Sequence, residues 1–468
     1  MNFAAIIRML ALCGLFYSAA MILCGLVALI AGEAAQLKSF LTTAVIMSTG
    51  SIATIVLIAK PKRRALPPDG LAFMVLFWFV SAIICAPPFL MGVANQSAIT
   101  ALHEAVSCLT TTGHSVFPPS DTPLPASLVL WRAILHIVGA VATITFAATV
   151  LAALNLDGPG IHRNHLFSLS DNSFFDSIPK VLRAVITVSS ICILIVFSIE
   201  VIGGIPANTA FLDAVSAFTT GLADPDRVSA DVTREARAIG LTVGLIFGTL
   251  GLYVLILAAS GKVRRTLMDA EVVAFAMAIA VFALLAFLSG LEVLNALGWS
   301  LSALSTSGIA LVSPASTHAL PLALQLAPAL VGGAALSAAG GIKLARLFVL
   351  GRRVGQEFLR VGYKQSLLTF TFRDRVQSDR TIMGIWVYLV AYIMASVLGL
   401  LLFAFTGESF EDAITNTVGG LTNSGSLIDL TSLAGNEVAQ ILLSLGMILG
   451  RLEVLAFVPV LTLSFWRR

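Results

Sequence analysis

The chain has 468 residues, of which 58% are hydrophobic and only 11% are charged. Soluble domains carry about 25% charged residues, so this composition excludes an ordinary soluble protein and predicts a protein embedded in a lipid bilayer. The net charge of +3 is too small to indicate a nucleic-acid partner, and the five cysteines form no CxxC pair that would favour a disulfide or a metal site.

A helix that crosses a bilayer needs about 20 apolar residues. Ten apolar runs in the sequence are read here as membrane-spanning helices, and they lie near 3–31, 38–59, 70–93, 126–155, 181–205, 235–260, 271–292, 321–350, 381–406 and 436–466. The first run is too long for the core of a cleaved signal peptide, so we predict that it is a retained helix.

Basic residues gather in alternate gaps between these runs. One gap holds four basic residues from Lys60 to Arg64, a second holds three from Lys262 to Arg265, and a third holds seven from Arg352 to Arg380. The remaining gap on that side, near 156–180, is close to neutral. The positive-inside rule predicts that these gaps and both chain ends face the cytoplasm.

Each outward gap carries a short apolar helix followed by Ser, Thr, Asn and Gly. The four segments are EAVSCLTTTGHS (104–115), DAVSAFTTGLAD (213–224), GWSLSALSTSGIA (298–310) and TVGGLTNSGSL (417–427). In three of them a small residue stands six positions before a Gly: Ser107 and Gly113, Ser302 and Gly308, Gly419 and Gly425. A pattern that recurs at one place in a span–loop–span unit indicates four copies of that unit.

We therefore expect an all-α membrane protein of about ten transmembrane helices, with four helix–pore loop–helix repeats around a central pore. The expected divisions are two leading helices at 1–65 and repeats at 66–165, 166–265, 266–375 and 376–468.

Loops of this kind suit a cation. Non-helical backbone at membrane depth is tolerated only where it is buried in protein or lines a water-filled cavity. Four loops around one axis can direct carbonyl oxygens at a dehydrated ion, and each preceding helix turns its negative C-terminal end towards the same point. Thr110, Thr111 and Thr112 add hydroxyl oxygens, while Glu104 and Asp213 are expected to start their short helices.

Two features of the later spans also indicate function. The stretch VGGAALSAAGG (331–341) has four Gly in a helical run, which predicts a break in the helix, with a Gly/Ala packing face as the alternative. Arg451 lies in the middle of the last span, where a charge is costly and indicates a functional site. The alternative for Arg451 is a structural ion pair with Glu453 or another carboxylate. Lys343 either positions the break or extends to the cytoplasmic face.

Four stretches match a known family most strongly, and the last two of them are specific: LTTTG (109–113), WRAIL (131–135), AAGGIKLARLFVL (338–350) and MILGRLEVLAFVPVLTLSFWR (447–467). With these stretches the chain resembles the Trk/Ktr/HKT superfamily of potassium transporters, and most closely its TrkH-type membrane subunits. The resemblance implies potassium uptake across the bacterial inner membrane, with both termini cytoplasmic. It also implies a homodimer with one pore per subunit, cytosolic nucleotide-binding regulatory subunits, surrounding membrane lipid, and potassium without an organic cofactor.

The resemblance further implies a potassium-binding selectivity filter made from four residues of each loop. These are Thr110, Thr111, Thr112, Gly113, Thr219, Thr220, Gly221, Leu222, Ser305, Thr306, Ser307, Gly308, Thr422, Asn423, Ser424 and Gly425. Loop two departs from the pattern, because Leu222 stands where the other loops have Gly. Either that loop is one residue shorter, or its quadrant of the filter is shaped differently. The preference of the pore for potassium over sodium therefore stays open. His114 is unexpected beside Gly113 and is either a solvated residue of the outer mouth or a group whose protonation repels cations.

The resemblance makes the break at 331–341 an intramembrane gate and places Arg451 in the cavity below the filter. The gate residues are Gly332, Gly333, Ala334, Ala335, Gly340, Gly341 and Lys343.

Two other functions are alternatives to ion conduction. A secondary transporter of another small solute, working by alternating access, would favour paired inverted repeats, whereas these repeats share one orientation. A membrane enzyme would need clustered ligand or catalytic residues, but the six histidines are scattered, so no enzyme is expected. Whether uptake is channel-like or coupled to another ion stays open.

Overall fold

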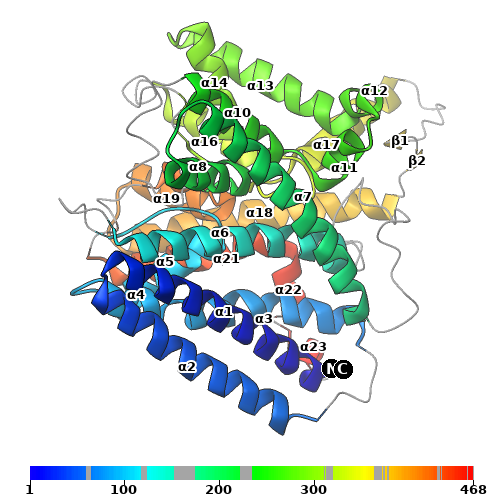
Figure 1. The fold of residues 1–468 in the computed structure, drawn as a ribbon. Helices are drawn as coiled ribbons and strands as arrows, with labels where there is room; N and C mark the ends of the chain where they lie inside the picture. Colours follow the sequence, from blue (N-terminus) through cyan, green and yellow to red (C-terminus); the bar gives the residue numbers. More distant parts are fainter. Residues whose placement is uncertain are drawn as a thin grey trace.

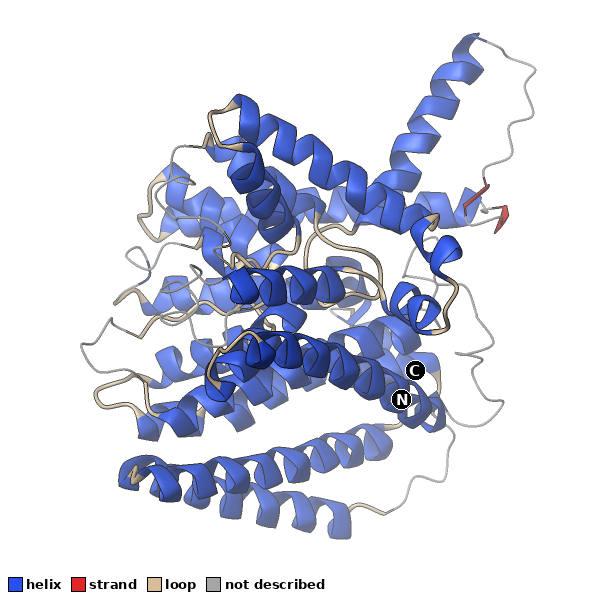
Figure 2. Cartoon of the chain, turned by 45° about the horizontal axis from the view of Figure 1, so that its top comes forward, coloured by secondary structure: helices blue, strands red, loops and turns tan. Residues whose placement is uncertain are grey.

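In the described part of the computed structural model the regular elements are helices, apart from one antiparallel pair of two-residue strands, β1 (Thr371–Phe372) and β2 (Arg375–Val376) (Figure 2). The described residues are 1–59, 65–117, 124–151, 174–221, 235–309, 311, 320–362, 371–372, 375–376, 379–428, 433, 435–460 and 462–466. Of the predicted features, Leu222, the basic residues from Lys60 to Arg64 and the neutral gap at 156–173 lie outside them.

Two leading helices, α1 (Phe3–Ala31) and α2 (Ala34–Leu57), form a hairpin at one edge of the bundle (Figure 1). Only 17% of the most apolar stretch of α2 is buried, against 78% for the span at Ala126–Val150. Because so many apolar side chains remain outward only in a lipid environment, α2 faces the bilayer and the span at Ala126–Val150 lies inside the protein.

The first two repeats follow. Repeat one consists of α3 (Pro67–Cys85), α4 (Pro87–Gly92), α5 (Ala98–Leu109) and α6 (Ala126–Phe146), which continues into a π-helical turn at Ala147–Leu151. Repeat two consists of α7 (Phe174–Ile202), α8 (Ala207–Thr219), α10 (Glu235–Thr249) and α11 (Leu252–Ala259), and α12 (Val263–Leu267) leads on to the third repeat.

Repeat three consists of α13 (Ala270–Leu288), α14 (Val293–Leu304), α16 (Leu322–Val331) and α17 (Leu344–Gly362). Repeat four consists of α18 (Asp379–Phe405), α19 (Phe410–Thr422), α21 (Glu437–Arg451), α22 (Phe457–Val460) and α23 (Leu463–Trp466), with 3-10 turns at Gly425–Leu427 and Val454–Ala456. The short helices α5, α8, α14 and α19 are called the pore helices below. Ser97 and Ser409 start the first and last of these by accepting the N–H of the residue three positions on.

The described part contains seven helices long and apolar enough to cross a bilayer, rather than ten continuous ones. The other three predicted spans are broken. Helices α10 and α11 meet at an angle of 114°, α16 and α17 are separated by a non-helical loop, and α21 ends at Arg451. A count of apolar residues does not detect these breaks, because each broken run is as long and as apolar overall as a continuous span.

The two ends of the chain lie together. The rings of Phe3 and Trp466 stack with their centroids 6.2 Å apart, and both views show the termini side by side (Figures 1 and 2). Helix α12, which carries Arg264 and Arg265, lies towards the same side of the bundle in Figure 1. This arrangement agrees with the common side that the basic gaps predict for the chain ends.

Candidate functional site

The four pore helices end in the same backbone turn. In each repeat one residue, four positions after the recurring small residue, has a left-handed φ between 53° and 59°. These residues are Thr111, Thr220, Thr306 and Asn423. A left-handed residue is uncommon outside glycine, so its recurrence at one position indicates that the four loops begin with one shared conformation.

Hydrogen bonds show that loop two keeps the register of loops one and four. The N–H of Thr112 donates to Ser107 O at 2.9 Å, that of Gly221 to Ser216 O at 3.2 Å, and that of Ser424 to Gly419 O at 2.9 Å. Gly221 therefore takes the place of Thr112, and the described part of loop two is not shortened. Its difference lies in the residue types, since a glycine replaces the residue that is Thr or Ser in the other loops.

Close packing brings the loops together. A Cβ atom on Gly221 would lie 2.1 Å from Thr111 O, and one on Gly425 would lie 2.3 Å from Thr112 O. Gly308 meets loop four in the same way, because its Cβ would lie 2.0 Å from that of Ser426. Loop one thus touches loops two and four, and loop three touches loop four. Their backbones approach so closely that these positions have no room for a larger residue.

The hydroxyl groups of loop one already have partners. Thr110 Oγ1 donates to Val106 O at 2.8 Å and lies 2.9 Å from Thr112 Oγ1. Asn423 Nδ2, from loop four, donates to Thr112 Oγ1 at 3.2 Å. Because these hydroxyls serve the protein itself, backbone carbonyls are left as the main oxygen ligands that the loops offer to an ion.

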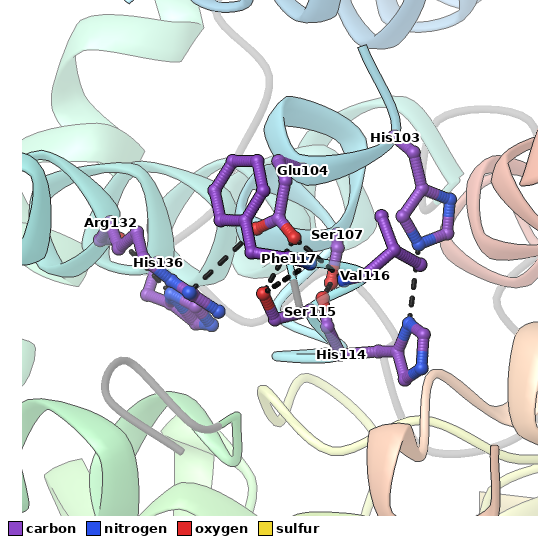
Figure 3. A network of polar contacts seen from close by, with 9 residues as sticks. All are labelled: His103, Glu104, Ser107, His114, Ser115, Val116, Phe117, Arg132 and His136. Carbon is purple, nitrogen blue, oxygen red and sulfur yellow. Dashed lines mark hydrogen bonds and ion pairs between the residues drawn. The ribbon is translucent and has the colours of Figure 1, made fainter. Parts of the chain in front are cut away.

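Acidic residues anchor two pore helices from their middles, not from their starts as the sequence suggested. Glu104 accepts bonds from Ser115 Oγ at 2.7 Å and from the N–H of Val116 at 2.8 Å, and it pairs with Arg132 at 3.7 Å (Figure 3). Asp213 pairs with Arg237 at 2.6 Å. The expected N-terminal placement was wrong because each helix begins about two turns earlier, at Ala98 and Ala207.

Three glycines that the sequence did not single out hold α6, α10 and α21 against the pore helices. A Cβ on Gly139 would lie 1.7 Å from Leu109 O, one on Gly248 2.3 Å from Phe218 O, and one on Gly450 2.4 Å from Leu421 O. The three carbonyls occupy the same position in their pore helices. Glycine is frequent in membrane helices, so the sequence had no signal that separated these three from the rest.

The stretch between α16 and α17 is non-helical, which rules out a helix-packing face there. Gly332, Leu336, Gly341 and Lys343 all have positive φ, between 58° and 80°. The loop lies against the four-loop cluster. The N–H of Gly340 donates to Thr306 Oγ1 at 2.9 Å, and a Cβ on Gly340 would lie 1.7 Å from Thr422 O.

The same stretch is held by the broken helix of repeat two and by the first turn of α13. The N–H groups of Ala334 and Ala338 donate to Thr249 O at 3.0 Å and to Gly248 O at 3.1 Å, and Ala335 N donates to Glu271 Oε1 at 3.2 Å. Lys343 is buried and donates to Ser337 O at 3.4 Å and to Ala339 O. Lys343 therefore does not extend to the cytoplasmic face.

Arg451 joins the loops to this stretch. Its Nε donates to Thr110 O at 2.5 Å, its Nη1 to Ala338 O at 2.5 Å, and its Nη2 to Thr111 Oγ1. Glu453, the predicted alternative partner, pairs instead with Arg346 of α17. No ion pair within the described residues includes Arg451, so the alternative of a structural pair is wrong for this part of the chain.

His114 is buried, with 4% of its surface exposed, so the expectation of a solvated outer-mouth residue was wrong. Its Nδ1 lies 3.2 Å from Nε2 of His103, a residue of α5 that the sequence did not bring into the site (Figure 3). The contact forms because the loop after α5 turns back along this helix, and the sequence spacing of the two histidines does not indicate it.

Comparison with known proteins covers the whole chain. No protein-family model matches it. The Trk system potassium uptake proteins TrkH of Salmonella typhimurium and Escherichia coli K12 are 27% and 26% identical to it, over all of both chains. The Escherichia coli K12 protein TrkG is 24% identical over 85% of each chain.

The crystal structure of the potassium transporter TrkH from Vibrio parahaemolyticus has the same fold, with a TM-score of 0.84, 24% identity and full coverage of both chains. The repeats described above account for this fold, since each supplies one pore helix and one loop. Along its entire length the chain is therefore similar in sequence to the TrkH potassium uptake proteins and shares its fold with a TrkH structure.

Proposed function

We propose that this chain takes up potassium ions across the bacterial inner membrane through one pore formed by its four loops. The observation that carries the proposal is the convergence of four identical turns on one place, where Gly221 and Gly425 pack directly on the carbonyls of Thr111 and Thr112. A ring of carbonyls can replace the hydration shell of a monovalent cation. The relatives named above are potassium uptake proteins, which supports potassium as the cargo.

In this proposal the ion binds at the four loop segments described above and then passes the non-helical stretch below them. That stretch, from Gly332 to Lys343, is the gate, because it lies directly under Thr306 and Thr422. Arg451 fixes its closed position through Ala338 O and places a positive charge below the filter. The charge limits how many cations gather in the cavity and so helps each ion to leave.

The chain is a multi-pass membrane protein, and its relatives are components of Trk systems, which implies that other components work with them. We infer a homodimer with one pore per subunit and a cytosolic nucleotide-binding regulatory subunit at the basic face. The stacked chain ends and α12 support a shared cytoplasmic side. The repeat divisions at 66–165, 166–265, 266–375 and 376–468 stay a prediction.

A matched pair of glycine substitutions tests the filter. Gly113 and Gly32 have nearly equal φ angles, +73° and +74°, but Gly32 lies in the α1–α2 turn with nothing within 4 Å of a Cβ. Replacing either with Ser adds a similar backbone cost of about 1–3 kcal/mol. Rubidium and sodium uptake is measured in a host that lacks its own potassium uptake.

Wild type and Gly32→Ser should take up rubidium in preference to sodium. Gly113→Ser should lose that preference or lose uptake while still reaching the membrane. A wild-type chain that gives the host no rubidium uptake would overturn the proposed function, and a Gly113→Ser variant with wild-type preference would remove Gly113 from the filter.

A further inference from the structure

Two buried histidines connect the end of loop one, directly after Gly113, to helix α21. His114 follows Gly113 directly, and its Nδ1 lies 3.2 Å from His103 Nε2 (Figure 3). His103 Nδ1 in turn lies 3.0 Å from Ser444 Oγ and 3.2 Å from Gln440 O, both on α21. The described contacts therefore run from α21 through the pore helix α5 to the residue next to the filter.

The hydrogen bonds fix the direction of each proton. Ser444 Oγ donates to Gln440 O at 2.7 Å, so its oxygen is free to accept a bond from His103 Nδ1. A neutral imidazole with its proton on Nδ1 accepts at Nε2. His114 must then carry its proton on Nδ1 and donate it to His103. The two rings thus form a chain of hydrogen bonds with one direction. His114 donates to His103, and His103 donates to an acceptor on α21.

The backbone of His114 is held as firmly as its ring. Ser107 Oγ donates to His114 O at 2.6 Å, so this carbonyl is turned back onto the pore helix. The N–H side packs on loop four, since His114 N would lie 2.9 Å from a Cβ on Gly425. Gly113, with its φ of +73°, cannot change the direction of its carbonyl without moving a residue that is fixed on three sides.

We propose that His114 and His103 are positioning residues that hold the first filter strand and thereby set the preference of the pore for potassium over sodium. The inference rests on the proposed function, since it assumes that Gly113 lies in a filter. The preference of a carbonyl cage depends on how well its oxygens keep their spacing around a smaller ion. A filter strand that has lost these hydrogen bonds can move towards the pore axis and close around the smaller sodium ion. The strand that His114 holds cannot make this movement.

The test compares a variant that removes the donor with one that restores it. His114→Leu removes the Nδ1–H group, and His114→Asn places an amide N–H close to the same position. The control is Thr100→Val, because Thr100 Oγ1 bonds Gln440 Oε1 at 3.1 Å and so joins the same two helices without leading to the filter. The readout is the ratio of rubidium to sodium uptake, with folding checked by size-exclusion profile and thermal midpoint.

We expect His114→Leu to lower the ratio by about fivefold, the factor that one net hydrogen bond is worth in an equilibrium constant. His114→Asn should stay within about twofold of wild type, and Thr100→Val should keep the wild-type ratio even if its midpoint falls. If His114→Leu does not fold, His103→Gln, which lacks a group at the Nδ1 position, should lower the ratio in the same direction.

Equal ratios in His114→Leu and wild type would overturn the inference, as would equal losses in His114→Leu and Thr100→Val. Neither result touches the proposed function, which fails only if the wild-type chain itself takes up no rubidium.

Discussion

At the scale of single residues, Arg451 is the most informative side chain. It reaches the carbonyl of Thr110 in the filter strand and the carbonyl of Ala338 in the non-helical stretch at once. In the proposed gate, replacing Arg451 with Ala removes a hydrogen bond that keeps this stretch in its closed position. Since a charged hydrogen bond contributes about 1.5–3 kcal/mol, we expect rubidium uptake by the purified chain in liposomes to rise about tenfold.

A lysine variant separates the charge of Arg451 from its bridging geometry. Arg451→Lys retains the positive charge but presents one compact ammonium group, which cannot span the three acceptors that the guanidinium reaches. We expect it to leak like Arg451→Ala. If Arg451→Lys transports like wild type while Arg451→Ala does not, the charge alone is responsible, and if both behave like wild type, Arg451 is not part of a gate.

Single residues also show what the sequence could and could not reveal. Gly113 and Arg451 were predicted because each is exceptional in its own neighbourhood, as a glycine in a repeated pattern or a charge in an apolar span. The roles of His103 and Glu104 were not, because their partners are decided by packing. The His103 partners on α21 lie more than 330 positions away, and Glu104 meets Ser115 only once the chain has turned back on itself.

At the scale of elements, the breaks in three of the ten predicted spans were only partly predictable. The break after Gly332 was expected, because glycines with positive φ interrupt a helix readily. The bend between α10 and α11 was not, since Gly248 and Gly251 look like the packing glycines that are common in membrane helices. The bend is completed from elsewhere: the N–H of Leu252 donates to Leu336 O, in the non-helical stretch of the next repeat, at 3.0 Å.

The glycines that pack α6, α10 and α21 against the pore helices give a stability prediction at this scale. In Gly450→Ala the new Cβ would lie 2.4 Å from Leu421 O and 2.8 Å from Asn423 Oδ1, so helix α21 must shift away from the pore helix α19. Overpacking of this kind costs about 1–3 kcal/mol. We expect a lower thermal unfolding midpoint in detergent, measured by tryptophan fluorescence, together with weaker rubidium uptake.

Gly384→Ala is the matched control for this substitution. Gly384 lies inside the helix α18 with nothing within 4 Å of a Cβ, so alanine adds helix propensity without a clash. Its midpoint should equal or exceed that of wild type. A Gly450→Ala midpoint as high as that of Gly384→Ala would show that α21 does not depend on this close approach.

At the scale of the whole molecule, the repeated architecture was predictable because each repeat leaves its own local record. A span, a short helix and a Ser/Thr/Gly loop occur four times in one orientation, and the four left-handed turns follow the same spacing. How the repeats meet was not predictable, because the contacts of Gly221 with Thr111 and of Gly308 with Ser426 join loops more than one hundred residues apart.

The orientation of the molecule in the membrane yields the last prediction, and α13 allows it to be tested with one helix. Arg264 precedes α13 in a basic segment, and Glu292 follows the C-terminal end of this helix; both are exposed. The positive-inside rule places Arg264 in the cytoplasm and therefore Glu292 outside. A membrane-impermeant maleimide should label Glu292→Cys in intact cells and Arg264→Cys only after lysis, with wild type as the blank. Labelling of Arg264→Cys in intact cells would show that the molecule has the opposite orientation in the membrane. An ion entering from outside would then meet the non-helical stretch before it meets the four loops.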